Sequence, residues 1–352
     1  MLNQSSPPKL SICIPAYNRA IYLAPLLRSI FNQKNSDYEV VIAEDCSPER
    51  DQITSTVEQF EAEFPGLIRY ELNEENLGYD GNIRRLFELS RGDYCLFLGN
   101  DDLLAPNALY AVSKVLQRVK DCGVVVRTYA TFDKSPSEFK QTFRYFPNEL
   151  VIAPGAEAIA VGYRRSVVIP GMVIHRESAI SVATDKFDGT LLYQLLLVGM
   201  ILAKKSVVFI PEIIGLRRDG NAPDFGNSKS EQGKFTPKEQ TPESSLHFMV
   251  GMLAIAKHVQ KTTGLPVYEP ILSDIGAYSY PILSIQADKS RLVFLGYGLE
   301  LAKLGLWKHP FFYVYFFLLI FLGAARTDGL IRWVKRSLGY TPRLGGLPGG
   351  RN

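Results

Sequence analysis

The sequence of 352 residues predicts an α/β fold in which a mostly parallel sheet is flanked by helices and followed by a helical C-terminal region. Two observations lead to this prediction. First, short and almost entirely apolar segments alternate with helical segments over residues 10–132, and strands of this kind are typical of parallel sheets covered on both faces. Second, from residue 244 onward the apolar spacing is helical, with no further strand pattern.

The individual elements follow from the apolar spacing and from the turn signals between segments. Strands are expected at residues 10–17, 38–45, 68–72, 93–101 and 123–132. The helices between and after them are expected at 20–33, 51–64, 80–90 and 105–120. After about Asp133 the pattern is looser. We expect a hairpin at 143–152, a short helix at 155–162, a strand leading into a helix at 167–179, a helix at 191–204 and a strand at 206–218.

The chain therefore divides into an α/β domain and a helical part. A segment rich in Gly, Pro, Ser, Asn and Lys separates them at 219–243, and its length is typical of a lid or a disordered connection. The expected organisation is a flexible N-terminus at 1–9, the α/β domain at 10–218, the loop or lid at 219–243, a helical region at 244–308, a further helical segment at 309–340 and a flexible tail at 341–352.

Composition and missing motifs exclude several classes of protein. A net charge of +3, without a basic stripe interleaved with aromatic residues, argues against nucleic acid as a partner. The cysteines form no CxxC pair, so buried reduced thiols are expected. No GxGxxG follows the first strand, and GxxxxGK[ST], HExxH and GxSxG do not occur. Dinucleotide-dependent enzymes, P-loop proteins, zinc hydrolases and α/β-hydrolases are therefore disfavoured. The first nine residues lack the features of a secretory signal.

The most hydrophobic stretch lies near the C-terminus, at 309–325. Its uncharged core, 311–325, has about 15 residues, fewer than the ~20 that span a bilayer. Lys and Arg lie on both sides of it, which argues against a simple span because cytoplasmic flanks hold most of these residues. We therefore predict an interfacial or re-entrant helix, followed by a basic amphipathic helix at 329–338. The alternative is a helix buried in a domain interface or in a homo-oligomer.

Polar side chains follow the strands of the predicted sheet. Asn18 and Arg19 follow the first strand, and Asp101 and Asp102 follow the fourth. Ligands of parallel α/β sheets bind at the carboxyl ends of the strands. Adjacent carboxylates repel each other, and a hard divalent cation that also binds phosphate oxygens relieves the repulsion. The alternative is that one of the two aspartates only caps the next helix.

Three segments in series, SICIPAYNRAIYLAPLLRSIFNQ at 11–33, EVVIAEDCSPERDQ at 39–52 and ENLGYDGNIRRLFELSRGDYCLFLGNDDLLAP at 75–106, resemble family 2 glycosyltransferases with a GT-A fold. The resemblance covers about residues 9–130 and continues more weakly to Arg218. The last segment is similar to the branch that includes bacterial abequosyltransferases of O-antigen assembly. The resemblance implies a Rossmann-like sheet, a nucleotide-sugar donor and a divalent cation, Mn²⁺ or Mg²⁺.

The resemblance also implies roles for individual residues. The loop that holds the base and ribose corresponds to Pro15, Ala16, Tyr17, Asn18 and Arg19. The paired acids after the second strand are Glu44 and Asp45, and the loop that closes over the nucleotide contains Asn76, Gly78, Asp80 and Asn82. Asn100 and Asp101 would contact the donor, and Asp101 and Asp102 would bind the metal. Arg217, or its neighbour Arg218, matches a late basic residue near the phosphates, where the planar guanidinium suits phosphate.

Two positions depart from the family pattern. The first aspartate of the Asp-x-Asp-Asp metal motif is Gly99 here, which affects the expected donor more than catalysis. The general base of the family usually comes from a Glu-Asp doublet before a later helix. The matching segment, DKFDGTLLYQLLLVG, breaks the doublet, so Asp188 is the predicted base and Asp185 the alternate. A competing interpretation of Asp188 is an N-cap of the helix that follows.

The resemblance implies inverting transfer of a sugar from a nucleotide diphosphate to a hydroxyl group. The apolar tail suggests a polyprenyl-diphosphate-linked saccharide as acceptor and a site at the cytoplasmic face of the inner membrane, reached by a peripheral or re-entrant helix. Synthesis of a surface polysaccharide such as O-antigen or capsule is the expected context. An inactive nucleotide-sugar-binding scaffold is the alternative. A nucleotidyltransferase is disfavoured because the loop after the first strand has no glycine.

Overall fold

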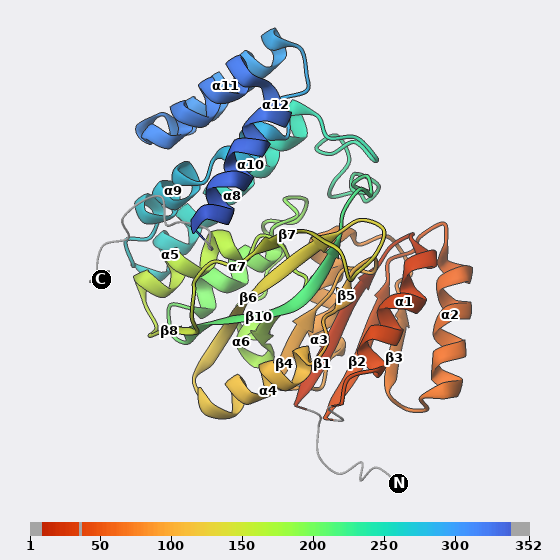
Figure 1. Ribbon diagram of the computed structural model, residues 1–352. Coiled ribbons are helices and arrows are strands. Elements are labelled where there is room, and N and C mark those ends of the chain that lie inside the picture. The colour runs from red at the N-terminus through yellow and green to blue at the C-terminus, as the bar shows by residue number, and fades with distance from the viewer. Residues whose placement is uncertain (1–8, 35–36, 339–352) are drawn as a thin grey trace.

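The computed structural model describes residues 9–34 and 37–338, and its centre is a ten-stranded sheet. The first four long strands are β1 (Leu10–Ala16), β2 (Tyr38–Glu44), β3 (Ile68–Leu72) and β4 (Tyr94–Phe97). They run parallel in the order β3-β2-β1-β4. Figure 1 shows them side by side, with their carboxyl ends at the top of the view. The predicted flexible ends at 1–9 and 341–352 lie outside the described residues, except for Lys9.

The second half of the sheet contains one reversed strand. β9 (Met172–His175) is antiparallel to both β4 and β6 (Cys122–Phe132), and β10 (Ser206–Arg218) is parallel to β6. Hence β6 and β10 run in the same direction as β1–β4. Three short antiparallel strands complete the sheet: β5 (Leu103–Leu104), β7 (Phe139–Phe143) and β8 (Leu150–Ile152). The predicted α/β fold with a mostly parallel sheet is confirmed.

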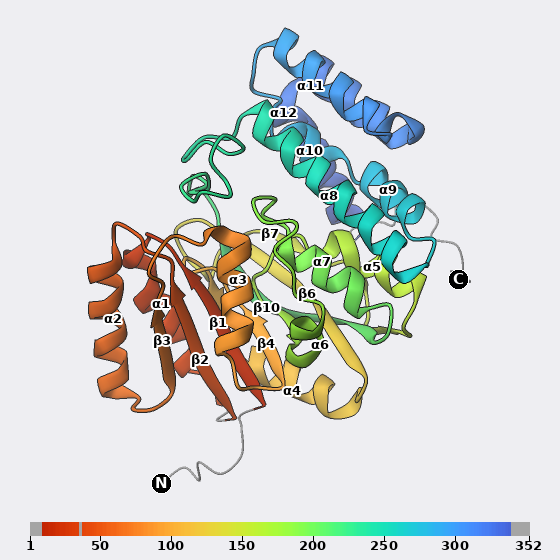
Figure 2. The ribbon, with the colours of Figure 1, turned by 180° about the vertical axis from the view of Figure 1, so that it is seen from behind.

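Helices cover both faces of the sheet, as the apolar strands indicated. One face carries α1 (Ala20–Phe31), α2 (Arg50–Glu63) and α4 (Ala108–Arg118). The opposite face, seen in Figure 2, carries α3 (Gly78–Leu89), α5 (Ala156–Arg165), α6 (Arg176–Ser181) and α7 (Tyr193–Ile201). Side chains alternate between the two layers: Ile12 and Ile14 of β1 belong to one buried cluster and Cys13 to the other. This alternation is the pleat of a strand.

The predicted hairpin at 143–152 is wrong. β7 pairs with β6, and β8 pairs with β10, so the two short strands lie against different partners. Both partners are long strands, of 11 and 13 residues, with edges free to extend the sheet. Local apolar spacing does not specify which strand a segment pairs with, because pairing depends on what the rest of the fold leaves open.

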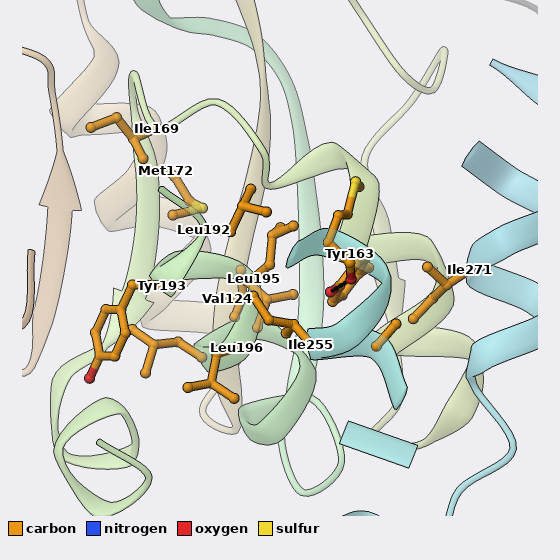
Figure 3. Packing of buried hydrophobic residues seen from close by; sticks show 14 of the residues in the cluster. Val124, Tyr163, Ile169, Met172, Leu192, Tyr193, Leu195, Leu196, Ile255 and Ile271 are labelled. Atoms are coloured by element: carbon orange, nitrogen blue, oxygen red, sulfur yellow. Dashed lines mark hydrogen bonds between the residues drawn. The ribbon is translucent and has the colours of Figure 1, made fainter. Parts of the chain in front are cut away.

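The C-terminal part is helical and packs on the α7 face of the sheet. It consists of α8 (Pro242–Thr263), α9 (Tyr268–Ala277), α10 (Tyr280–Ser284), α11 (Arg291–Lys303), the short 3₁₀ turn η1 (Leu306–Lys308) and α12 (Pro310–Leu338). Figure 3 shows Leu195 and Leu196 of α7 beside Ile255 of α8 and Val124 of the sheet. Tyr163 of α5 donates a hydrogen bond to the carbonyl of Met252 in α8, at 2.7 Å. The helical part therefore shares a core with the α/β domain.

α12 is divided by a break at Gly323, whose φ of 75° and ψ of 171° are not helical. The hydroxyl of Thr327 donates to the carbonyl of Leu318 at 3.3 Å, although these residues would be about 13.5 Å apart along a straight helix. The chain therefore turns back at Gly323. Within the described residues, the segment Pro310–Val334, with a hydropathy of 1.6, is the one helix long and apolar enough to cross a membrane by length and composition. The turn divides it into two pieces shorter than the ~20 residues of a span.

Candidate functional site

A cavity of about 370 Å³ lies at the carboxyl ends of β1, β2 and β10, beneath the loop that joins β10 to α8. Figure 1 shows this loop above the same edge of the sheet. The walls are the β1–α1 turn, the start of α3, the β4–β5 loop and the segment 167–170. The loop at 219–241 contains no helix and no strand longer than a single bridge. We call this loop the lid.

The turn between β1 and α1 holds the first wall of the cavity. Asn18 and Arg19 adopt left-handed φ values of 51° and 62°, which turn the chain sharply after the strand. The side-chain amide of Asn100, from the β4–β5 loop, donates to the carbonyl of Asn18 at 2.7 Å. The Arg19 guanidinium donates to the Asp101 carboxylate at 2.6 Å. These bonds connect the ends of two neighbouring strands.

Asp101 and Asp102 lie side by side at the cavity wall. Asp102 is buried and accepts backbone N–H bonds from Gly99 and Arg218, both at 3.1 Å. Burial and the neighbouring Asp101 carboxylate raise the pKa of Asp102 to about 8. A Cβ atom at Gly99 would lie 2.8 Å from the Asp102 carboxylate. The glycine that departs from the family motif therefore leaves room for Asp102 to fold back onto the backbone.

The acidic pair fits a divalent cation only together with a second source of ligands. In the described parts of the chain, no group of three or more His, Cys, Asp or Glu side chains could hold a metal ion. Mg²⁺ and similar ions commonly bind one or two carboxylates and complete their shell with phosphate oxygens and water. The Arg19 guanidinium and the Asn221 amide, at 2.6 and 2.8 Å, now occupy one oxygen of Asp101. Arg19 thus supplies the positive charge next to this carboxylate.

Asp45, at the end of β2, organises the opposite end of the cavity. Its carboxylate accepts the backbone N–H groups of Leu77 and Gly78, at 2.9 and 3.0 Å, and the side-chain amide of Asn73. Burial raises the pKa of Asp45 to about 6, against the lowering effect of these hydrogen bonds. A residue with a side chain would be strained at Gly78, because its φ is 75° and atoms of the lid lie directly against it. The start of α3 is therefore fixed at the cavity.

Two of the predicted binding residues, Glu44 and Asp80, lie behind the cavity lining and hold segments that form it. Glu44 is fully buried, accepts the backbone N–H of Ser47 at 2.8 Å and pairs with Arg50. Asp80 is also buried, and its carboxylate accepts backbone N–H bonds from the segment 189–193, at 2.8 to 3.0 Å. Glu44 therefore shapes the β2–α2 loop, and Asp80 connects α3 to the start of α7.

The structure thus divides the predicted binding residues into two groups. Those that line the cavity are Pro15, Tyr17, Arg19, Asp45, Asn76, Gly78, Asn82, Asn100, Asp101, Asp102 and Arg217. Those that lie behind the lining are Ala16, Asn18, Glu44 and Asp80.

Asp188, the predicted base, is held outside the lining. Both of its carboxylate oxygens accept from the Arg84 guanidinium, at 2.8 Å each. Its backbone N–H bonds to the carbonyl of Asp185, so the two acids lie in one turn. Asp188 is not the cap of α7, because Asp80 accepts the backbone N–H of Tyr193, the first residue of that helix. Gly189 and Leu191 follow Asp188, and Leu191 lines the cavity.

Three residues of the lid belong to the site, although the sequence analysis did not select them. Asn221 donates to Asp101 at 2.8 Å, and Asp224 accepts from the Asn18 side chain at 2.6 Å. Glu231 is buried and accepts the backbone N–H of Tyr79 at 2.7 Å. The acidic residues within this Gly- and Pro-containing loop were the available signal in the sequence.

The lid approaches the α/β domain at two glycines. A Cβ atom at Gly78 would overlap the hydroxyl of Ser228, and one at Gly189 would overlap the carbonyl of Ser230. The φ of Gly189 is 81°, a value that residues with a Cβ rarely adopt. The close contact between lid and domain therefore depends on the absence of side chains at these positions.

Comparisons with known proteins match the N-terminal half of the chain to one family. Residues 11–179 match the family model described as glycosyl transferase family 2. The chain is 39% identical over 114 residues to the abequosyltransferase RfbV of Salmonella typhimurium, which is 32% of this chain and 34% of that protein. It is 31% identical over 115 residues to the GalNAc(5)-diNAcBac-PP-undecaprenol beta-1,3-glucosyltransferase of Campylobacter jejuni, covering 32% and 35%.

The matched regions thus span about a third of the length of these curated relatives. Among solved structures, TarS of Staphylococcus aureus (residues 1–349, in complex with UDP-GlcNAc) superposes with a TM-score of 0.56. The superposition covers 83% of this chain and 75% of that one, at 15% sequence identity, and so shows a shared fold.

Proposed function

The chain carries a glycosyl transferase family 2 domain at residues 11–179, and from this premise we propose that it moves a sugar from a nucleotide diphosphate to a hydroxyl group of a lipid-linked saccharide. The observation that carries the proposal is the polar cavity at the carboxyl ends of the strands. Its carboxylates and Arg217 come from separate segments and converge where α/β sheets bind nucleotides.

The donor would lie along the cavity between two groups of residues. The nucleoside would contact Tyr17, Asp45 and Asn76, and the diphosphate would lie between Arg217 and the pair Asp101 and Asp102. The acidic pair would hold a divalent cation, Mn²⁺ or Mg²⁺, which neutralises the charge on the leaving diphosphate when bound. For the cation to bind, Arg19 must release its carboxylate oxygen of Asp101.

The general base is proposed to be Asp188. An inverting transfer needs a base within reach of the acceptor hydroxyl, on the side of the sugar opposite the leaving nucleotide. Asp188 lies in the turn before Leu191, which lines the cavity. Glu231 of the lid lies nearby, but its carboxylate already accepts the backbone N–H groups of Tyr79 and Gly226. To accept a proton, Asp188 must exchange part of its pairing with Arg84 for the hydroxyl.

The acceptor is proposed to be bound to a membrane lipid and to belong to surface polysaccharide synthesis. α12 turns back at Gly323 and exposes apolar side chains such as Phe317, Phe321 and Trp333. Arg326 and Arg332 lie among them, which suits an anionic membrane surface on the cytoplasmic side. The name of the Campylobacter relative includes an undecaprenol diphosphate acceptor, which agrees with this proposal.

The test is calorimetric titration of the full chain with UDP-, dTDP-, CDP- and GDP-sugars, each with Mn²⁺ and then with EDTA. We expect one donor to bind in a metal-dependent way, and Asp101→Asn to weaken this binding about tenfold or more. The matched control is Asp93→Asn, an exposed aspartate at the opposite end of β4. Binding of no donor would overturn the proposal, and binding without any sugar transfer would favour a scaffold.

A further inference from the structure

A second cavity, of about 460 Å³, lies next to the polar cavity. It lies between the sheet and helices α8, α9 and α10. The two cavities share the lining residues Val167, Val168, Leu191, Arg217, Phe225 and Phe248. A molecule in the second cavity would therefore contact the same wall as the sugar of the donor.

The lining of the second cavity is largely apolar, with aromatic rings from the sheet, the lid and the helices: Tyr129, Phe143, Tyr145, Phe235, Tyr278 and Tyr297. Several polar groups of the wall already have partners within the protein. The Ser245 hydroxyl accepts from Gln286 at 2.9 Å, and the Tyr297 hydroxyl donates to a backbone carbonyl at 3.1 Å. Arg164 bonds to Asp274 at 2.7 Å.

Because these polar groups are hydrogen-bonded within the protein, they are not available to a ligand, and this determines which part of a glycolipid fits the cavity. A sugar ring carries several hydroxyl groups, and burying them without hydrogen-bond partners is unfavourable. A hydrocarbon chain needs no such partners, and burying it stabilises the complex in proportion to its apolar area. The cavity therefore suits a chain rather than a saccharide.

The cavity also extends from the transfer site towards α12, the helix proposed to contact the membrane. At one end is Arg217, which it shares with the polar cavity. At the other is α10, where Ile285 is 42% exposed at the rim. Tyr280 of α10 packs against Tyr315 of α12, with ring centroids 5.6 Å apart. The apolar path thus runs from the transfer site to the helix that carries the exposed apolar side chains.

We propose that the second cavity, which we call the acceptor-lipid pocket, binds the isoprenoid chain of the acceptor, with its diphosphate near the wall that the two cavities share. The proposal rests on the function proposed above. Because the pocket and the donor cavity share lining residues such as Leu191, only a short saccharide fits between the lipid and the reacting hydroxyl. The acceptor is therefore an early, short lipid-linked saccharide.

The test uses Ile285→Trp, which places an indole at the rim of the pocket, far from the acidic pair. The matched control is Val250→Trp on α8, a side chain 47% exposed that does not line this pocket. The full chain is titrated by calorimetry, without detergent, with farnesyl diphosphate, inorganic diphosphate and dodecyl phosphate. The nucleotide sugar that binds is titrated separately.

We expect farnesyl diphosphate to bind at least about tenfold more tightly than inorganic diphosphate, since its chain adds buried apolar area. Ile285→Trp should reduce this advantage, whereas Val250→Trp and nucleotide-sugar binding should be unchanged. Equal binding of the two diphosphates, or no effect of Ile285→Trp, would overturn the proposal. Dodecyl phosphate binding as tightly as farnesyl diphosphate would overturn the assignment to an isoprenoid.

The two proposals fail in different ways. If no nucleotide sugar binds but farnesyl diphosphate still binds in the pocket, the proposed transferase function is wrong and the lipid site remains. If a nucleotide sugar binds with metal, but farnesyl diphosphate binds no more tightly than inorganic diphosphate, the proposed function stands and the proposed lipid pocket is wrong.

Discussion

The two adjacent cavities are built on opposite principles. In the polar cavity, carboxylates such as Asp45 and Asp102 are buried and held by backbone N–H groups, so their positions are fixed before a ligand arrives. In the acceptor-lipid pocket, polar side chains such as Ser245 are satisfied by their neighbours, and the wall presents hydrocarbon. The comparison indicates that directional bonds select the donor and apolar contact selects the acceptor. Leu191 and Arg217 belong to both cavities.

The largest effect is expected where the two cavities meet. Asp188→Asn should lower kcat by about 10²- to 10⁴-fold, because proton abstraction by a positioned side chain contributes this much. The measurement is kcat with a short lipid-linked acceptor at saturating donor. Donor binding should change little, because Asp188 does not line the polar cavity.

The matched comparison for Asp188 is Glu231→Gln, an acid of the lid that lines the polar cavity. We expect it to affect donor KM more than kcat, since Glu231 bonds to the backbone of Tyr79 and Gly226. If Glu231→Gln lowers kcat by this factor and Asp188→Asn does not, the proton acceptor lies in the lid and the proposed base is wrong.

The sequence correctly predicted that residues at the strand ends lie close together, and the reason is physical. The carboxyl ends of parallel strands meet at one edge, so Arg19 and Asp101, 82 residues apart, come within 2.6 Å. Glu44 and Asp45 show the limit of this kind of prediction. They are adjacent acids of one type, but neighbouring residues of an extended chain point to opposite sides. Asp45 therefore lines the cavity, and Glu44 bonds to Arg50 behind it.

The lid could not be placed from the sequence. Its residues have no regular spacing, and no local signal indicates which strand end they contact. Asp224 reaches Asn18 across 206 residues, and Glu231 reaches Tyr79 across 152. The acceptor-lipid pocket was unpredictable for a related reason. It forms between separately predicted elements, and its apolar residues have the same pattern as those of an ordinary core.

A second prediction concerns Asp80, which holds the segment between the two cavities. Burial raises the pKa of Asp80 from 3.8 to about 6, even though backbone N–H groups favour its charged form. A raised acid pKa means that ionisation opposes folding: the unfavourable contribution is absent below pH 3.8 and complete above pH 6. The shift corresponds to about 3 kcal/mol of unfolding free energy.

The comparison that isolates this effect is between wild type and Asp80→Asn, which cannot ionise. The free energy of unfolding of the wild type, relative to the variant, should fall by up to about 3 kcal/mol as pH rises from 3.8 to 6. Urea unfolding at a series of pH values measures it. Parallel pH curves for the two proteins would show that the buried carboxyl keeps its ordinary pKa.

The smallest expected effect concerns the contact between the lid and the α/β domain. Gly189→Ala forces a Cβ against the carbonyl of Ser230 at a φ of 81°, a strain of about 1–3 kcal/mol. The overlap with the Ser230 carbonyl, unlike the backbone strain, is relieved when the lid moves away, so the lid should lose its contact before the domain unfolds. Donor affinity should then fall about tenfold, since the lid residues Asn221 and Asp224 line the polar cavity.

Donor binding by Gly189→Ala is best compared with donor binding by a variant at a second glycine of left-handed φ. The matched variant is Gly264→Ala, a glycine with φ of 73° at the end of α8 and no atom within 4 Å of its Cβ position. It carries similar backbone strain without the contact to the lid. If the two variants bind the donor equally, closure of the lid does not contribute to donor affinity, and the polar cavity is complete without it.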